Sequence, residues 1–143
     1  MAGGTLMGAT SFSSGGAAGV SQANQAALEA ETDEDTYAPP DLIKHSPGVA
    51  KCWIKWEASG AHSIVGSYNI TSVTDGGQAG DTDGVIATDF SSVNDQVFAG
   101  LTDDAKFLSI GTSAAGTWTS RTYAHDGTLS DVDRNMMAMF GDQ

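Results

Sequence analysis

Three histidines are the residues best suited to chemistry. His45, His62 and His125 could act as metal ligands or as a general base. His125-Asp126-Gly127 has the composition of a turn, and the sequence contains neither a Gly-x-Ser-x-Gly elbow nor a His-Glu-x-x-His pair. We therefore expect no enzymatic activity, no catalytic residue and no metal site.

Closely spaced carboxylates form a second candidate site. Asp81-Thr82-Asp83-Gly84, with Asp75 nearby, has alternating oxygen ligands of the kind that hold calcium. An EF-hand loop would end in Glu at its twelfth position, but that position counted from Asp81 is Ser92. We therefore expect a polar hairpin turn here. Asp103-Asp104 is interpreted as another turn, and Asp131-Val132-Asp133 as an acidic loop before the last strand.

Aromatic side chains could stack on sugar rings if they are exposed. The candidates are Trp53, Trp56, Trp118, Tyr68 and Tyr123. Because Trp53 and Trp56 are three residues apart in one expected strand, they face opposite sides, and at least one belongs to the core. We expect core or subunit-interface positions for these rings, and the sequence assigns no receptor-binding residue.

The size and charge of the chain exclude several functions. Its 143 residues suffice for one ordinary domain. It has 6 Lys and Arg against 18 Asp and Glu, and a formal charge of −12 argues against binding to nucleic acid or to an anionic membrane. We expect no signal peptide, no membrane insertion and no cofactor. The single cysteine, Cys52, cannot form an internal disulfide.

Composition divides the chain before the predicted head domain into two parts. Residues 1–20 are uncharged and rich in Gly, Ser and Ala, which predicts a flexible arm or an attachment arm that becomes ordered on a partner. Residues 21–48 are expected to contain a short helix over 22–31 with Ser21 as N-cap, an acidic turn and a Pro-containing connector. The thin Ala/Leu stripe of this helix favours packing against copies of itself.

Residues 49–143 follow the two-residue alternation of β-strands. Short strands separated by turn residues predict an all-β fold, with a small antiparallel β-sandwich head. Met136 and Met137 must point to opposite faces, which suits a strand covered on one side by the sandwich and on the other by a neighbour. The seven expected strands are residues 51–56, 63–74, 84–90, 96–101, 106–111, 116–123 and 135–141.

Four blocks of sequence follow one another in a characteristic order. The first two are Asn24-Gln25-Ala26-Ala27-Leu28-Glu29-Ala30-Glu31-Thr32-Asp33-Glu34-Asp35-Thr36-Tyr37-Ala38-Pro39 and His45-Ser46-Pro47-Gly48-Val49-Ala50-Lys51-Cys52-Trp53. The others are Ser67-Tyr68-Asn69-Ile70-Thr71-Ser72-Val73-Thr74-Asp75-Gly76-Gly77 and the ending Asp131-Val132-Asp133 with Phe140-Gly141-Asp142. Together they resemble the terminal β-domain of tail-fibre proteins from tailed bacteriophages.

The resemblance implies a bacteriophage virion structural protein. We expect a homotrimeric tail-fibre-type adhesin, attached to other virion proteins through its N-terminal arm, with host-surface glycans as candidate ligands. Because only 20 residues precede the helix segment, a long fibre shaft is missing. A capsid-associated head fibre or cement (decoration) protein is therefore the alternative, and a free lectin or glycan-active enzyme is the third.

Overall fold

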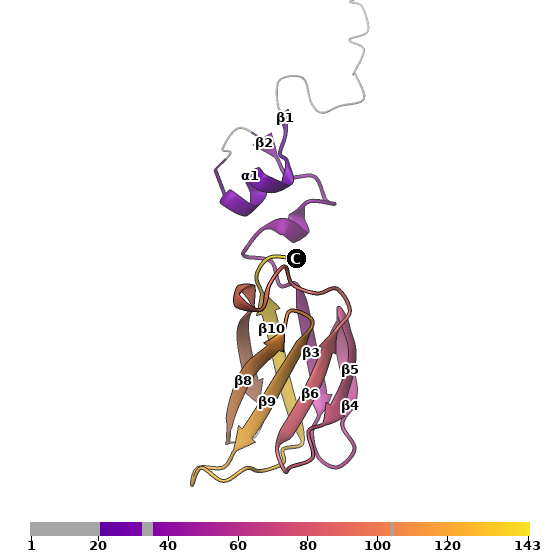
Figure 1. The fold of residues 1–143 in the computed structure, drawn as a ribbon, viewed down its shortest axis with the longest axis vertical. Helices are drawn as coiled ribbons and strands as arrows, with labels where there is room; N and C mark the ends of the chain where they lie inside the picture. Colours follow the sequence, from indigo (N-terminus) through magenta and orange to yellow (C-terminus); the bar gives the residue numbers. More distant parts are fainter. Residues whose placement is uncertain (1–20, 33–35, 104) are drawn as a thin grey trace, which may run out of the picture.

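The computed structural model describes residues 21–32, 36–103 and 105–143. The arm expected at residues 1–20 lies outside the described residues. Figure 1 shows the described chain as a small N-terminal unit that precedes two layers of β-strands. The predicted fold class, a small antiparallel β-sandwich, is confirmed.

Two four-stranded sheets form the sandwich. Their strands are β3 (Cys52–Glu57), β4 (Ser63–Tyr68), β5 (Ile70–Asp75), β6 (Asp81–Ile86), β7 (Val97–Thr102), β8 (Phe107–Ala114), β9 (Thr117–Tyr123) and β10 (Arg134–Phe140). The first sheet has the order β4-β3-β10-β7 and the second the order β5-β6-β9-β8. All neighbouring strands within these two sheets are antiparallel.

The core lies between the two sheets because alternate residues of each strand point inward. Trp56 of β3 and Trp118 of β9 are fully buried, with ring centroids 5.1 Å apart and planes tilted by 55°. The Trp56 indole donates a hydrogen bond of 3.3 Å to the hydroxyl of Thr82. The other buried apolar residues of this cluster are Cys52, Ile54, Ala58, Ile86, Phe90, Val132, Met137 and Met139.

Two expectations about the strands are wrong. The single strand predicted over 63–74 is two strands, β4 and β5, which belong to different sheets. Asn69 lies between them with a positive φ of 56°, a backbone turn that ends one strand and starts the next. The predicted hairpin turn over 81–84 is the first part of β6, and its register pairs Asp81 with Arg121 and Gly84 with Trp118. The chain turns earlier, between β5 and β6.

The N-terminal unit contains a two-stranded parallel sheet and two short helical segments. Its elements are β1 (Ser21–Gln22), α1 (Gln25–Ala30), β2 (Thr36–Tyr37) and the 3-10 helix η1 (Ile43–His45). Ser21 is not the helix cap, because it pairs with Thr36 as extended backbone. Asn24 caps α1 instead, and its side-chain oxygen accepts a 2.9 Å hydrogen bond from the amide of Ala27.

The strands run along the long axis of the molecule, so their connections gather at two ends (Figure 1). The N-terminal unit and the C-terminal residues lie at the proximal end. The opposite, distal end carries the connections β3–β4, β5–β6, β7–β8 and β9–β10. The His125-Asp126-Gly127 turn and the 131–133 loop, both predicted, lie in the last of these connections. Asp103 follows β7, as expected of a turn, whereas Asp104 lies outside the described residues.

Candidate functional site

The three histidines are not brought together. His45 lies in η1 at the proximal end, where its Nδ1 is 3.8 Å from Oε1 of Glu29. His125 lies in the distal turn and packs edge-on against Phe107, with ring centroids 5.6 Å apart. His62 lies in the β3–β4 connection. No group of three or more His, Cys, Asp or Glu side chains in the described part of the chain is placed to hold a metal ion.

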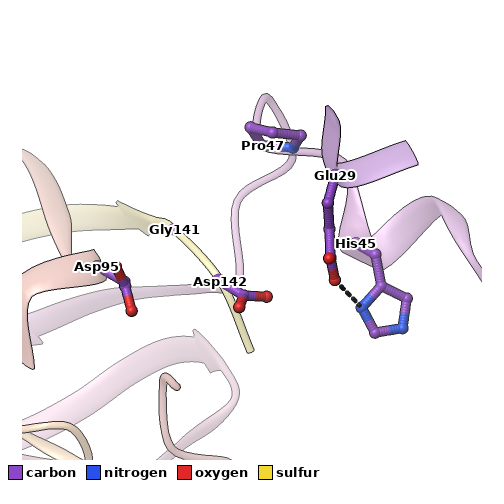
Figure 2. Close-up of a pocket in the computed structure, with 6 residues that line it drawn as sticks. All are labelled: Glu29, His45, Pro47, Asp95, Gly141 and Asp142. Atoms are coloured by element: carbon purple, nitrogen blue, oxygen red, sulfur yellow. Dashed lines mark ion pairs between the residues drawn. The ribbon is translucent and has the colours of Figure 1, made fainter. Parts of the chain in front are cut away.

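A pocket of about 300 Å³ lies between the N-terminal unit and the proximal end of the sandwich (Figure 2). Its lining combines one imidazole with three carboxylates, and the residues are Glu29, His45, Pro47, Asp95, Gly141 and Asp142. The carboxylates make this pocket more favourable for a cation than for an anion. Its walls come from α1, η1, the connector after η1, the β6–β7 connection and the C-terminal residues, so it also marks where the two parts of the chain meet.

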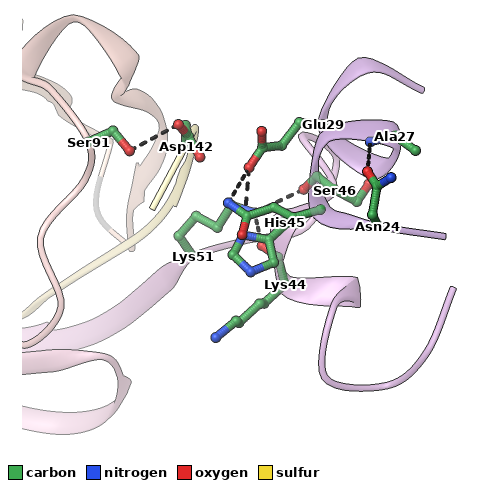
Figure 3. Close-up of polar contacts among 10 residues, drawn as sticks. Asn24, Ala27, Glu29, Lys44, His45, Ser46, Lys51, Ser91 and Asp142 are labelled. Carbon is green, nitrogen blue, oxygen red and sulfur yellow. Dashed lines mark hydrogen bonds and ion pairs between the residues drawn. The ribbon is translucent and has the colours of Figure 1, made fainter. Parts of the chain in front are cut away.

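Lys51 joins the N-terminal unit to the sandwich (Figure 3). Its ammonium donates hydrogen bonds to the backbone carbonyls of Lys44 and Ser46, the latter at 3.0 Å. Burial lowers the pKa of Lys51, and the nearby carboxylates of Asp142 and Glu29 partly offset this effect. The residue therefore acts as a structural tie between the connector and β3, a role that the sequence analysis did not assign.

The carboxylate of Asp81 is bound to a cation of its own chain. Its Oδ1 accepts a 3.1 Å hydrogen bond from Nε of Arg121, the cross-strand partner on β9. The negative charge of Asp81 raises the pKa of Arg121, as do the hydrogen bonds that Arg121 donates to Asp81 and Tyr123. Asp83 lies on the same outer face of the second sheet, where its cross-strand partners are Thr74 and Thr119. This outer face is therefore largely polar, although Val85 and Phe107 are exposed on it.

The expected division of the tryptophans is confirmed. Trp56 and Trp118 are core residues, whereas Trp53 is 45% exposed on the outer face of the first sheet. Tyr68, its cross-strand partner on β4, is 56% exposed, and Tyr123 is half-buried at the distal end of β9. Met136 and Met137 face opposite sides, as predicted, because Met137 is buried in the core while Met136 lines the outer face.

The outer face of the first sheet is largely apolar. One row across the sheet runs from Tyr68 through Trp53 and Ala138 to Ala99, and the next row contains Gly66, Lys55, Met136 and Leu101. We call the outward-facing side chains of Trp53, Tyr68, Val97, Ala99, Leu101, Met136 and Ala138 the apolar face; Met136 and Ala138 are half-buried and the others are exposed. A groove of about 790 Å³ crosses it.

The apolar face carries little charge. Lys55 lies near its centre, while Glu57 and Arg134 are cross-strand partners toward its distal edge. Asp103 lies opposite Arg134 on the β7 side, where its Oδ1 accepts a 3.0 Å hydrogen bond from the Arg134 amide. Two cations and two carboxylates leave the face with no net charge, in a chain whose charge is −12. No ion-pair or hydrogen-bond partner of the Lys55 ammonium is found among the described residues.

The distal connections are held in place by hydrogen bonds. The amide of Gly80 donates to Oδ1 of Asp131 at 2.6 Å, which ties the β5–β6 connection to the β9–β10 connection. Within the latter, the amide and hydroxyl of Thr128 donate to Oδ1 of Asp126 at 3.0 and 2.6 Å, and these bonds lower the pKa of Asp126. Phe107 begins β8 nearby and is 59% exposed. The distal end therefore presents pre-organised polar loops beside an exposed aromatic ring.

The sequence analysis missed part of the apolar face. Val97 and Leu101 are 61% and 67% exposed, although the apolar residues of their strand resemble an ordinary core segment. The available signal was the continuity of apolar residues at both odd and even positions of β7, which predicts two covered faces.

Among the described residues, no helix is long and apolar enough to cross a membrane. No family model matches the chain, and neither a curated protein nor a solved structure matches it.

Proposed function

We propose that this chain is a structural protein of a tailed-bacteriophage virion, a trimeric fibre-type adhesin anchored through its N-terminal part. Its distal loops would contact the host surface, with glycans as the ligand class. Each single contact would be weak, and binding would be strengthened because three subunits and many virion copies act together. The protein is proposed to act by binding and not by catalysis.

The observation that carries this proposal is the separation of the two ends of the molecule. The N-terminal unit and the C-terminal residues lie at the proximal end, so attachment there leaves the four distal connections free (Figure 1). The hydrogen bonds from Gly80 to Asp131 and from Thr128 to Asp126 fix two of these connections, β5–β6 and β9–β10, before a ligand arrives. Pre-organised loops lose less conformational entropy on binding than loops that become ordered with the ligand.

Charge favours a local contact over broad electrostatic adhesion. Three copies of a chain with a charge of −12 carry −36, which opposes docking on anionic lipopolysaccharide. A sugar ring can instead stack on an exposed aromatic side chain. Phe107 offers such a ring at the distal end, and its edge-to-face neighbour His125 adds a polar group.

The capsid-associated alternative has its own supporting observation. Residues 1–28 contain no charged side chain, although the chain as a whole is strongly acidic. An uncharged segment can lie against a protein surface without the desolvation cost of a charge. A head fibre or cement protein would use this segment to bind neighbouring capsid subunits, and its sandwich would project from the head.

Gold labelling of intact particles with an antibody against residues 45–143 tests the proposal. Label at the tail tip is the expected result, and binding of the purified protein to host cells would then be measured with Phe107→Ser and with Val85→Ser as a control on the outer face of the second sheet. Label over the head would replace the tail location by the capsid-associated alternative. Particles without label would contradict both virion assignments.

A further inference from the structure

We infer that the apolar face is the surface through which copies of this chain contact one another. The inference rests on the proposed trimer and names the face that the subunits share. It starts from the contrast between the two outer faces of the sandwich. The first sheet presents Trp53, Val97 and Leu101 side by side. The second presents Asp83 and the Asp81–Arg121 pair, which separate its exposed apolar residues Val85 and Phe107.

Exposure of these side chains is costly for an isolated subunit. The exposed fraction is 56% for Tyr68, 45% for Trp53, 61% for Val97 and 67% for Leu101. These side chains lie on one continuous face with Met136. Single exposed apolar residues are ordinary, but a contiguous patch marks a contact surface. Covering the Leu and Val side chains on this face would therefore favour association.

Charge identifies a second copy as the occupant. Acidic copies repel one another, and this repulsion is weakest at a face whose two cations and two carboxylates cancel. Lys55 is unpaired among the described residues, and Glu57 lies two positions along the same strand on the same face. Glu57 of one copy is therefore a candidate ion-pair partner for Lys55 of another copy that meets it through this face.

The direction of the sheet also suits a parallel assembly. The strands run along the long axis, so three such faces can line a common axis while all N-terminal units point the same way (Figure 1). Four strands at about 4.8 Å spacing give the face an area of roughly 400 Å². That is about half of what one partner buries in an interface of standard size. We therefore expect association that depends on protein concentration.

Sedimentation velocity of the full chain tests this inference. Leu101→Asp places a charge on the apolar face, and Phe107→Asp places the same charge on an exposed apolar position of the other sheet's edge strand. We expect Leu101→Asp to weaken association about tenfold or more, since it loses the burial of one Leu side chain. Phe107→Asp should associate like the wild type. Circular dichroism shows whether each variant is folded. If Leu101→Asp does not fold, Lys55→Glu replaces it as the test variant on the apolar face.

Each outcome decides a different point. Equal association of the wild type and a folded Leu101→Asp overturns the apolar face as the contact, while the proposed trimer stands. Equal weakening by Phe107→Asp also overturns it, because the effect is then one of charge alone. A wild-type dimer that Leu101→Asp dissociates keeps the contact but contradicts the trimer. A wild type that is monomeric at every concentration contradicts both.

Discussion

The indole ring of Trp118 lies against the α-carbon of Gly84 on the neighbouring strand. A β-carbon placed on Gly84 would come within 2.0 Å of Cε2 of this ring. Trp118 is fully buried and packs on Trp56, so its ring has no free space into which to move. The absence of a side chain at position 84 is therefore what allows two tryptophans to share this small core.

We predict that Gly84→Ala lowers the free energy of unfolding by about 3 kcal/mol, because the added methyl group overpacks the core. Gly111→Ala is the matched control on the same sheet, since its β-carbon would meet only Oγ1 of Thr119, at 3.5 Å. This control should change stability by no more than about 0.5 kcal/mol. Urea unfolding followed by tryptophan fluorescence measures both variants. Similar stability of the two would contradict the packing argument.

Asn69 joins the two sheets through both its backbone and its side chain. Its side-chain amide donates to the carbonyls of Lys51 and Thr88 at 3.1 and 3.2 Å, and its side-chain oxygen accepts from the amide of Thr88 at 2.8 Å. Asn69→Gly should cost about 1–3 kcal/mol, because it keeps the positive φ but loses these hydrogen bonds. Asn69→Ala should cost about 1–2 kcal/mol more.

Thermal unfolding of the two Asn69 variants gives this order directly. Asn94→Ala is the control, because Asn94 is an exposed residue of the 3-10 helix η2 (Val93–Asp95). It should leave the midpoint nearly unchanged. If Gly and Ala at position 69 destabilised the protein equally, the left-handed backbone would contribute nothing measurable, and the corner would be held by the side chain alone.

Strands with a clear alternation could be predicted from the sequence to within a few residues. The expected strands 116–123 and 135–141 correspond to β9 and β10, because inward and outward residues differ in kind. The corner at Asn69 was missed because β-branched and aromatic residues continue on both sides of it. The start of β6 was missed because Asp81 and Gly84 are typical of turns. Here a tertiary ion pair and the close approach of Trp118 override that local preference.

The apolar face could be predicted only in part. Alternation alone placed Trp53 opposite Trp56 and Met136 opposite Met137, but it did not show which residue of each pair faces the core. The grouping of Trp53 and Met136 with Leu101 depends on the strand order β4-β3-β10-β7, which brings together segments that are far apart in the chain. Nothing in a local pattern of residues determines that order. The tie made by Lys51 was missed for the same reason, since it depends on how the connector folds back on β3.

Cys52 is predicted to be unreactive in the folded protein. It is fully buried, and burial raises the pKa of its thiol from 9.0 to about 12. The thiolate is the reactive species, so a disulfide reagent at pH 8 should modify the native protein far more slowly than the urea-unfolded chain. Rapid stoichiometric modification under native conditions would contradict the burial of this side chain.

The same pKa shift predicts a pH dependence of stability. Between pH 9 and 12 the unfolded chain loses the Cys52 proton while the folded protein retains it. The contribution of this group is therefore unchanged below pH 9, and stability falls as the pH rises above that value. Comparing wild type with Cys52→Ala at pH 8 and pH 11 isolates this effect from other titrating groups. Relative to Cys52→Ala, the wild type should have a lower free energy of unfolding at pH 11 than at pH 8.

Lys51→Met is predicted to loosen the N-terminal unit without unfolding the sandwich. The variant leaves the carbonyls of Lys44 and Ser46 without their ammonium donor, but it also removes the desolvation of a buried charge. These effects oppose each other, so global stability should change by no more than about 1 kcal/mol. Hydrogen exchange should accelerate at the amides of η1 and remain slow in β3. Lys55→Met is the control, since Lys55 lies on the outer face of the same strand. Faster exchange throughout β3 would mean that Lys51 supports the sandwich itself and not only the attachment of the N-terminal unit.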